Sequence, residues 1–158
     1  MLAASPTLPL FLTLSACKGP AVLDAPPHVS QQTQVLLRAV TAEQNLVWIY
    51  AKVMSVYSGL AATLAPLRAE HEAHLAQLRA RVIEPPGKQV PATVTERPAV
   101  AATQAAALAQ LRAAEQAAIT AQVNRLAAAP ASLAQLYASI AACESTHVSV
   151  LAAKSAAR

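Results

Sequence analysis

The sequence contains few of the residues on which several common protein classes depend. Only 3 of the 158 residues are glycine, which excludes a glycine-rich phosphate loop of the Rossmann or P-loop type. Aromatic residues make up 3% of the chain, too few for the strands of a β-sandwich. Charged residues make up 13%, about half the usual share. The 12 Lys and Arg residues are scattered singly, so the net charge of +4 gives no support for nucleic-acid binding.

The chain is instead rich in alanine and leucine, and 55% of its residues are hydrophobic. Alanine has the highest helix propensity, so the composition predicts an all-α fold. Proline and glycine divide one domain, residues 30–156, into four amphipathic segments. We expect an antiparallel four-helix bundle built from two helical hairpins. The predicted helices cover residues 30–57, 60–84, 99–128 and 131–154, and Pro66 indicates either a kink or a later start in the second.

Ionisable residues interrupt the apolar stripe of every predicted helix near its middle. The chain has only 8 acidic residues and 4 histidines, so their positions are informative. Burying a carboxylate or an imidazole is costly unless the group is paired or bound to a metal. The interrupting residues, in chain order, are Glu43, His71, His74, Glu115, Glu144 and His147.

These residues repeat with nearly the same spacing in both predicted hairpins. Glu43 and His71 are 28 residues apart, and Glu115 and Glu144 are 29 apart. Counted from the predicted turns at about 1.5 Å of rise per residue, the partners in each hairpin lie at similar depth. The pattern indicates an internal duplication of a helical hairpin that carries one set of metal ligands per copy.

Glu144 and His147 form a Glu-x-x-His motif, whose side chains share one helix face. With inward glutamates on partner helices, this motif resembles the di-iron carboxylate arrangement of helical bundles. Residues 30–154 thus resemble the ferritin-like superfamily. More narrowly, they resemble small actinobacterial ferritin-like lipoproteins that carry a domain of unknown function. The segments AEQNL at 42–46 and LRAEHEAHL at 67–75 carry most of this likeness.

The resemblance implies a transition metal, iron or manganese, in the bundle core. Glu43 and Glu115 match the single glutamates of the first and third helices, and His74 matches the histidine of the second. Glu144 and His147 match the motif of the fourth.

At His71 the family's second helix normally has a glutamate. Either the adjacent Glu70 takes that place, or the site has three carboxylates and three histidines. A mononuclear site, a different metal or a lost site also remain open.

Three residues near the predicted ligands are interpreted as packing residues rather than as parts of the site. Tyr50 lies seven residues after Glu43, and Tyr137 lies seven before Glu144. In ferritin-like proteins a tyrosine near the metals can donate an electron or a hydrogen bond, but we interpret both as amphipathic core residues. Cys143 is predicted to be a small packing residue rather than a ligand.

The N-terminal segment predicts a membrane anchor. Residues 1–16 read as a signal peptide, and Leu-Ser-Ala-Cys at 14–17 resembles a bacterial lipobox. Cys17 would then be lipidated, residues 17–29 would form a flexible tether, and the bundle would be extracytoplasmic. No Lys or Arg precedes the apolar stretch, so either translation starts further upstream or the signal is poor. The alternative is a disordered apolar N-terminus.

Two functions follow from the sequence. The first is binding of a transition metal in the bundle core, with redox activity as an extension of it. The alternative is a metal-free bundle that acts as a surface interaction or structural lipoprotein. The partner we expect is the membrane, through the anchor at Cys17; the resemblance also allows a homodimer, and the sequence does not identify other protein partners.

Overall fold

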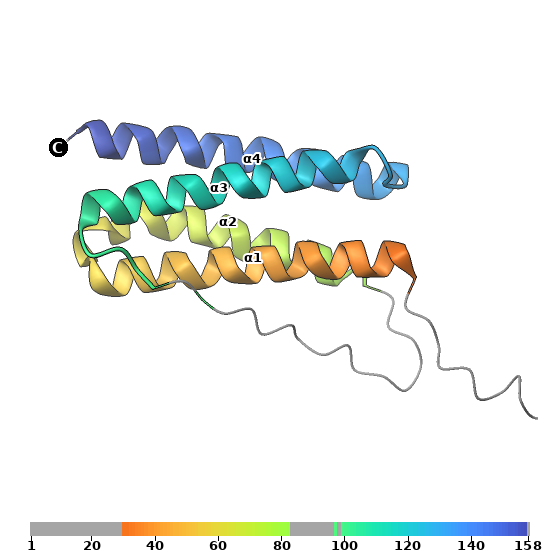
Figure 1. The fold of residues 1–158 in the computed structure, drawn as a ribbon, viewed down its shortest axis with the longest axis horizontal. Helices are drawn as coiled ribbons and strands as arrows, with labels where there is room; N and C mark the ends of the chain where they lie inside the picture. The colour runs from red at the N-terminus through yellow and green to blue at the C-terminus, as the bar shows by residue number, and fades with distance from the viewer. Residues whose placement is uncertain (1–29, 83–96, 98, 158) are drawn as a thin grey trace, which may run out of the picture.

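The computed structural model describes residues 30–82, 97 and 99–157 (Figure 1). Over these residues the chain is helical and contains no strand. Its elements are α1 (Gln31–Val56), the short 3-10 helix η2 (Ser58–Leu60), α2 (Ala61–Arg79), α3 (Gln104–Leu126) and α4 (Ala131–Ala156). The predicted signal peptide, the tether and Cys17 lie outside the described residues.

Polar side chains fix where α1 and α3 begin. Ser30 caps α1 by accepting a hydrogen bond of 3.1 Å from the backbone N–H of Thr33. Thr103 caps α3 in the same way, accepting from Ala106 at 3.2 Å. The third helix was predicted to begin at residue 99. It begins at Gln104 because Thr103 has an extended backbone, with φ of −124° and ψ of 152°.

The chain before Thr103 is held away from the helix by one side chain. Gln110 accepts a hydrogen bond from the backbone N–H of Ala101 at 3.1 Å and donates to the carbonyl of Ala99 at 2.9 Å. These two contacts satisfy the backbone N–H of Ala101 and the carbonyl of Ala99 outside the helix. They account for the five-residue difference from the predicted start.

The second helix is shorter than predicted but runs through Pro66. It begins at Ala61, so the alternative of a start near Pro66 is wrong. Its α-helical part ends at Arg79 rather than near residue 84. After it the backbone N–H groups of Arg81 and Val82 bond three residues back, at 3.1 and 3.0 Å. This tightening of the last turn is typical of helix ends.

The four long helices pack side by side as a bundle (Figure 1). Helix α1 packs mainly against α2, and α3 mainly against α4, with further contacts between α1 and α3 and between α2 and α4. No single described helix is long and apolar enough to cross a membrane. As a pair, α1 and the segment Ser58–Arg79 meet that test of length and composition, but they bend by 120° at their junction.

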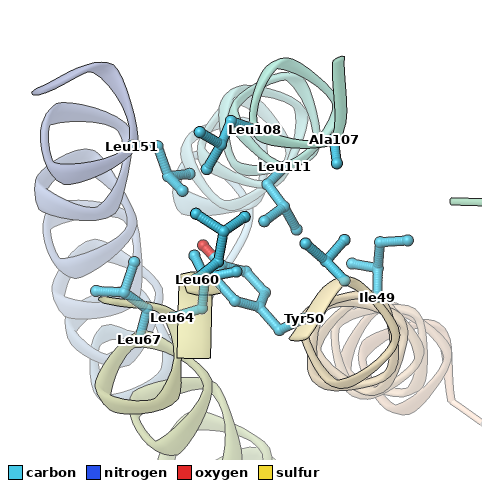
Figure 2. Close-up of a cluster of buried hydrophobic side chains, with 10 residues drawn as sticks. Ile49, Tyr50, Leu60, Leu64, Leu67, Ala107, Leu108, Leu111 and Leu151 are labelled. Atoms are coloured by element: carbon cyan, nitrogen blue, oxygen red, sulfur yellow. The ribbon is translucent and has the colours of Figure 1, made fainter. Parts of the chain in front are cut away.

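The core consists of two separate apolar clusters. The first lies near the α1–α2 turn and is shown in Figure 2. Its members are Ile49, Tyr50, Val53, Leu60, Leu64, Leu67, Ala107, Leu108, Leu111 and Leu151. The second lies toward the start of α1 and of α4. Its members are Leu36, Ala39, Val40, Leu75, Leu78, Leu133, Leu136, Tyr137 and Ile140.

Along each helix, the buried ionisable residues lie either between two residues of these clusters or directly after the last one. Glu43 lies between Val40 and Ile49 on α1, and the two histidines of α2 lie between Leu67 and Leu75. The fold therefore encloses a polar layer between two layers of aliphatic side chains.

Candidate metal centre

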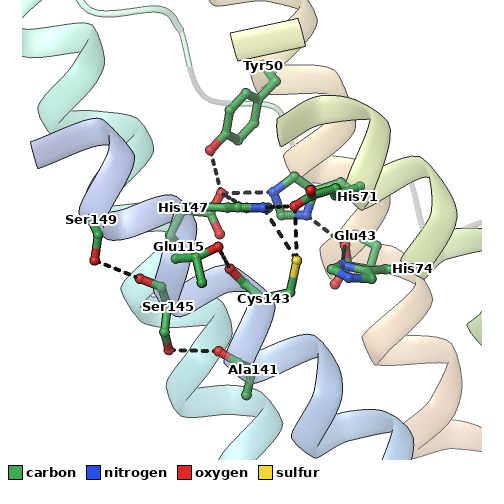
Figure 3. Close-up of polar contacts among 12 residues, drawn as sticks. Glu43, Tyr50, His71, His74, Glu115, Ala141, Cys143, Ser145, His147 and Ser149 are labelled. Carbon is green, nitrogen blue, oxygen red and sulfur yellow. Dashed lines mark hydrogen bonds and ion pairs between the residues drawn. The ribbon is translucent and has the colours of Figure 1, made fainter. Parts of the chain in front are cut away.

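All six residues predicted as metal ligands lie in this polar layer. Five are fully buried, and His74 is 8% exposed. The fully buried ones are Glu43, His71, Glu115, Glu144 and His147. Figure 3 shows the labelled histidines converging between the helices with Glu43 and Glu115. Similar depth along each helix, counted from the turns, was sufficient to predict this convergence.

His71 lies at the centre of the layer and bonds to two glutamates on different helices (Figure 3). Its Nδ1 is 3.0 Å from Glu43 Oε2, and its Nε2 is 2.8 Å from Glu115 Oε1. Burial opposes a charge on the imidazole, but the two carboxylates outweigh it and raise the pKa of His71 to about 9. In the metal-free protein, both ring nitrogens of His71 therefore donate to carboxylates at neutral pH.

Glu115 collects three donors at one oxygen. Its Oε1 accepts from Tyr50 at 2.5 Å, from His71 at 2.8 Å and from Nδ1 of His147 at 3.3 Å. Burial would raise the pKa of Glu115, but these donors and the charge on His71 lower it to about 2. The other oxygen, Oε2, is buried without a partner. Tyr50 therefore contacts the site directly, as a hydrogen-bond donor.

Glu43 has a more open arrangement. Besides its bond to His71, Glu43 Oε2 lies 3.7 Å from Nδ1 of His74, a distance too long for a hydrogen bond. Its Oε1 accepts a long hydrogen bond of 3.5 Å from Gln122. Sequence reasoning missed Gln122, although its place seven residues after Glu115 puts both on one helix face. Burial opposes the charge of Glu43, but its histidine neighbours lower its pKa.

Glu144 is the one acidic residue of the layer that has no donor. Both of its carboxylate oxygens are buried without a hydrogen-bond partner. Burial and the charges of Glu43 and Glu115 raise the pKa of Glu144 to about 9. At neutral pH in the metal-free protein, Glu144 therefore holds a proton.

The sequence left open whether Glu70 or His71 faces the site. In the structure, both contact other residues of the site. His71 points into the layer, whereas the side chain of Glu70 is 51% exposed. Glu70 Oε2 nevertheless lies 2.6 Å from Nε2 of His147. Cys143 is more than a packing residue, because its thiol donates to Glu70 at 3.0 Å. Burial and that carboxylate raise the pKa of Cys143 to about 12.

Three groups of ligand atoms in the described residues have spacings that could hold a metal ion. Two are buried in the layer: one consists of Glu43, His71 and His74, and the other of His71, Glu115 and His147. The third, at the edge of the layer, consists of Glu70, Cys143 and His147. Within each group the ligand atoms lie within 4.8 Å of one another. Glu144 belongs to none of these groups and lies beside the two buried ones as an additional carboxylate.

The buried groups fit a metal chemically. Imidazole and carboxylate ligands suit first-row transition metals such as iron and manganese. Four ligand atoms of the layer have no hydrogen bond: His74 Nδ1, Glu115 Oε2 and both oxygens of Glu144. Such unpartnered buried atoms are rare in proteins and call for an ion, a water or a functional role.

The two tyrosines that looked equivalent in sequence differ in the structure. Tyr50 bonds to Glu115, but the hydroxyl group of Tyr137 is buried without a partner, and Arg125 lies 5.9 Å above its ring. A surface pocket of ≈ 340 Å³ lies beside Tyr137, between the start of α1 and the α3–α4 turn. None of the histidines or glutamates of the polar layer lines it.

Comparisons of this chain with protein-family models, with curated proteins and with solved structures found no match. The functional argument therefore depends on the geometry of the polar layer.

Proposed function

We propose that this protein is a ferritin-like bundle of two helical hairpins that binds a transition metal, iron or manganese, in its polar layer. One observation carries the proposal: Glu144 is fully buried, and neither of its oxygens has a donor. A buried carboxyl group without a partner is costly whether it is ionised or held protonated, unless it is paired or bound to a metal. A bound cation would balance the charges of Glu144, Glu43 and Glu115 together.

The ligands would come from all four helices. Glu43, His71 and His74 form one set, and His71, Glu115 and His147 form the other. His71 belongs to both sets through opposite ring nitrogens, Nδ1 toward Glu43 and Nε2 toward Glu115. When bound, a redox-active metal would supply one-electron chemistry to this layer. The chain itself excludes bulk water from the layer by the leucine-rich clusters on both sides.

The membrane location is proposed on sequence alone. Residues 14–17 resemble a lipobox, and a lipidated Cys17 would hold the bundle outside the cell membrane. Mass spectrometry of the membrane fraction tests this: an unmodified Cys17 with residues 1–16 still attached would rule it out.

A specific observation also favours a metal-free bundle with a structural or interaction role. Protonated His71, placed between two carboxylates, supplies the cation that a metal would otherwise supply. In this alternative, Glu43, His71 and Glu115 form a closed hydrogen-bonded network whose role is to fix the packing of three helices. Glu144 and His74 then have no function that the network explains.

Metal analysis of loaded protein separates these alternatives. The metal-free chain is incubated with Fe(II) or Mn(II) without oxygen, desalted and analysed by mass spectrometry for metal content. We expect near-stoichiometric metal in the parent protein and a loss of most of it in Glu144→Ala and His74→Ala. Glu72→Gln, on the exposed face of α2 beside Arg68, is the matched control and should retain metal. Equal, sub-stoichiometric metal in all four proteins would overturn the proposal.

A further inference from the structure

A second set of ligand atoms lies at the outer edge of the polar layer, between α2 and α4. Cys143 Sγ is 3.6 Å from His147 Nε2 and 3.0 Å from Glu70 Oε2, and the two latter atoms are 2.6 Å apart. Cys143 and His147 are four residues apart on α4, so they share one helix face. Glu70 reaches them from α2.

One of the three distances among these atoms matches that of a tetrahedral zinc site. Zinc binds sulfur at about 2.3 Å, nitrogen at about 2.0–2.1 Å and oxygen at about 2.0–2.2 Å. At tetrahedral angles, these bonds place sulfur about 3.6 Å from nitrogen, and nitrogen about 3.3 Å from oxygen. The sulfur–nitrogen distance of 3.6 Å already agrees. The shorter distances to Glu70 are those of hydrogen bonds, and the half-exposed Glu70 side chain can move outward.

We propose that Glu70, Cys143 and His147 form a second metal site, open to solvent and selective for Zn²⁺. A thiolate, an imidazole and a carboxylate are all zinc ligands, and the soft sulfur disfavours the hard cations Mg²⁺ and Ca²⁺. Three protein ligands leave one tetrahedral position for water or an external ligand, as in catalytic zinc sites. Zinc binding would displace the thiol proton of Cys143 to solvent.

This site overlaps the proposed core site at one residue, His147, which also belongs to the group of His71, Glu115 and His147. It shares no residue with the group of Glu43, His71 and His74. Its one link to the layer is His147, whose Nδ1 faces Glu115 while its Nε2 faces Glu70 and Cys143 (Figure 3). A substitution at Cys143 therefore tests the outer site, and one at His74 tests the core site, each without the other.

The experiment uses Co(II) as a spectroscopic probe for Zn²⁺ on the full, reduced chain. Co(II) bound by a thiolate gives a sulfur-to-metal charge-transfer absorption, which excess Zn²⁺ should remove by displacement. We expect the band in the parent protein and in His74→Ala, and its loss in Cys143→Ser. Loss of a ligand should weaken affinity by at least the roughly 10–100-fold that loss of a ligand's hydrogen-bond partner costs. Glu72→Gln is the control and should keep the band.

Alkylation of Cys143 gives a second readout that does not depend on colour. Zn²⁺ should slow alkylation of Cys143 in the parent protein, and peptide mass spectrometry distinguishes this residue from Cys17. Glu70→Gln should lose most of the protection while its fold, measured by circular dichroism, stays intact. Absence of the band in the parent protein, or unchanged alkylation with Zn²⁺ present, would overturn the proposal. Neither result would bear on metal bound by Glu43, His71 and His74.

Discussion

The hydroxyl group of Tyr50 on α1 donates a hydrogen bond of 2.5 Å to Glu115 on α3, across 65 residues of sequence. Both side chains are fully buried, and Glu115 carries a negative charge because its pKa is lowered to about 2. The bond joins the first helical pair to the second at the boundary between the apolar cluster and the polar layer. Removing this bond therefore directly tests how much the layer contributes to stability.

Tyr50→Phe should destabilise the protein by about 1.5–3 kcal/mol, the usual contribution of a hydrogen bond to a charged group. Urea unfolding measures the loss. Tyr57→Phe is the matched control, because its hydroxyl group donates at 2.7 Å to a neutral backbone carbonyl, that of Ala101. A neutral bond contributes about 0.5–1.5 kcal/mol. If Tyr50→Phe costs no more than Tyr57→Phe, the hydrogen bond to Glu115 is not a strong one.

The stability of the metal-free protein should peak near pH 4.5 and fall as the pH rises toward 9. The pKa of His71 is raised from 6.5 to about 9, so its contribution is complete below pH 6.5 and lost as pH rises through 9. The pKa of Glu144 is raised from 4.5 to about 9, which also lowers stability as pH rises. The pKa of Glu115 is lowered to about 2, so its contribution disappears as pH falls from 4.5 toward 2.

Urea unfolding in the presence of a chelator, at intervals from pH 3 to pH 9.5, measures this profile. A free energy of unfolding that stays level or rises between pH 6.5 and 9 would contradict the protonated state assigned to His71 and Glu144.

Glu144→Gln and Glu43→Gln make the same chemical change in one buried layer and should have opposite effects. Glu144 is held protonated beside Glu43, so a neutral amide should stabilise the metal-free protein at pH 8 by about 1–3 kcal/mol. Glu43→Gln removes one of the two carboxylates that pair with His71, and should cost about 3 kcal/mol.

Metal content provides the second half of this test. Glu144→Gln should lower metal loading even while it raises stability, as expected of a carboxylate whose burial serves binding. The interpretation fails if Glu144→Gln is less stable than the parent protein at pH 8, or if its metal content is unchanged.

Pro66→Ala should stabilise the protein without affecting the site. Pro66 lies inside α2 on an exposed position, where it removes one helical hydrogen bond. Alanine is favoured over proline by about 3 kcal/mol in a helix interior, and the unfolded chain recovers part of this through its added freedom. We expect a gain of about 1–3 kcal/mol in urea unfolding and unchanged metal content. A loss of stability would mean that the chain depends on the altered geometry at Pro66.

The sequence alone was sufficient to predict four helices and the depth of the ionisable residues. Helical rise is constant, so counting from the turns placed Glu43, His71 and Glu115 at one level before any packing was known. Helix ends were less predictable. The start of α3 depends on the contacts of Gln110 with Ala99 and Ala101, which only the folded chain brings together.

Contacts between helices determined which of these side chains interact with one another. Tyr50 and Tyr137 are both seven residues from a glutamate, but only Tyr50 faces a carboxylate of another helix. Cys143 becomes a candidate ligand because Glu70 reaches it from α2. Periodicity determines which face of a helix a residue occupies, because that depends on backbone geometry within the helix. Which side chain lies opposite depends on how the helices pack, and only the tertiary structure contains that information.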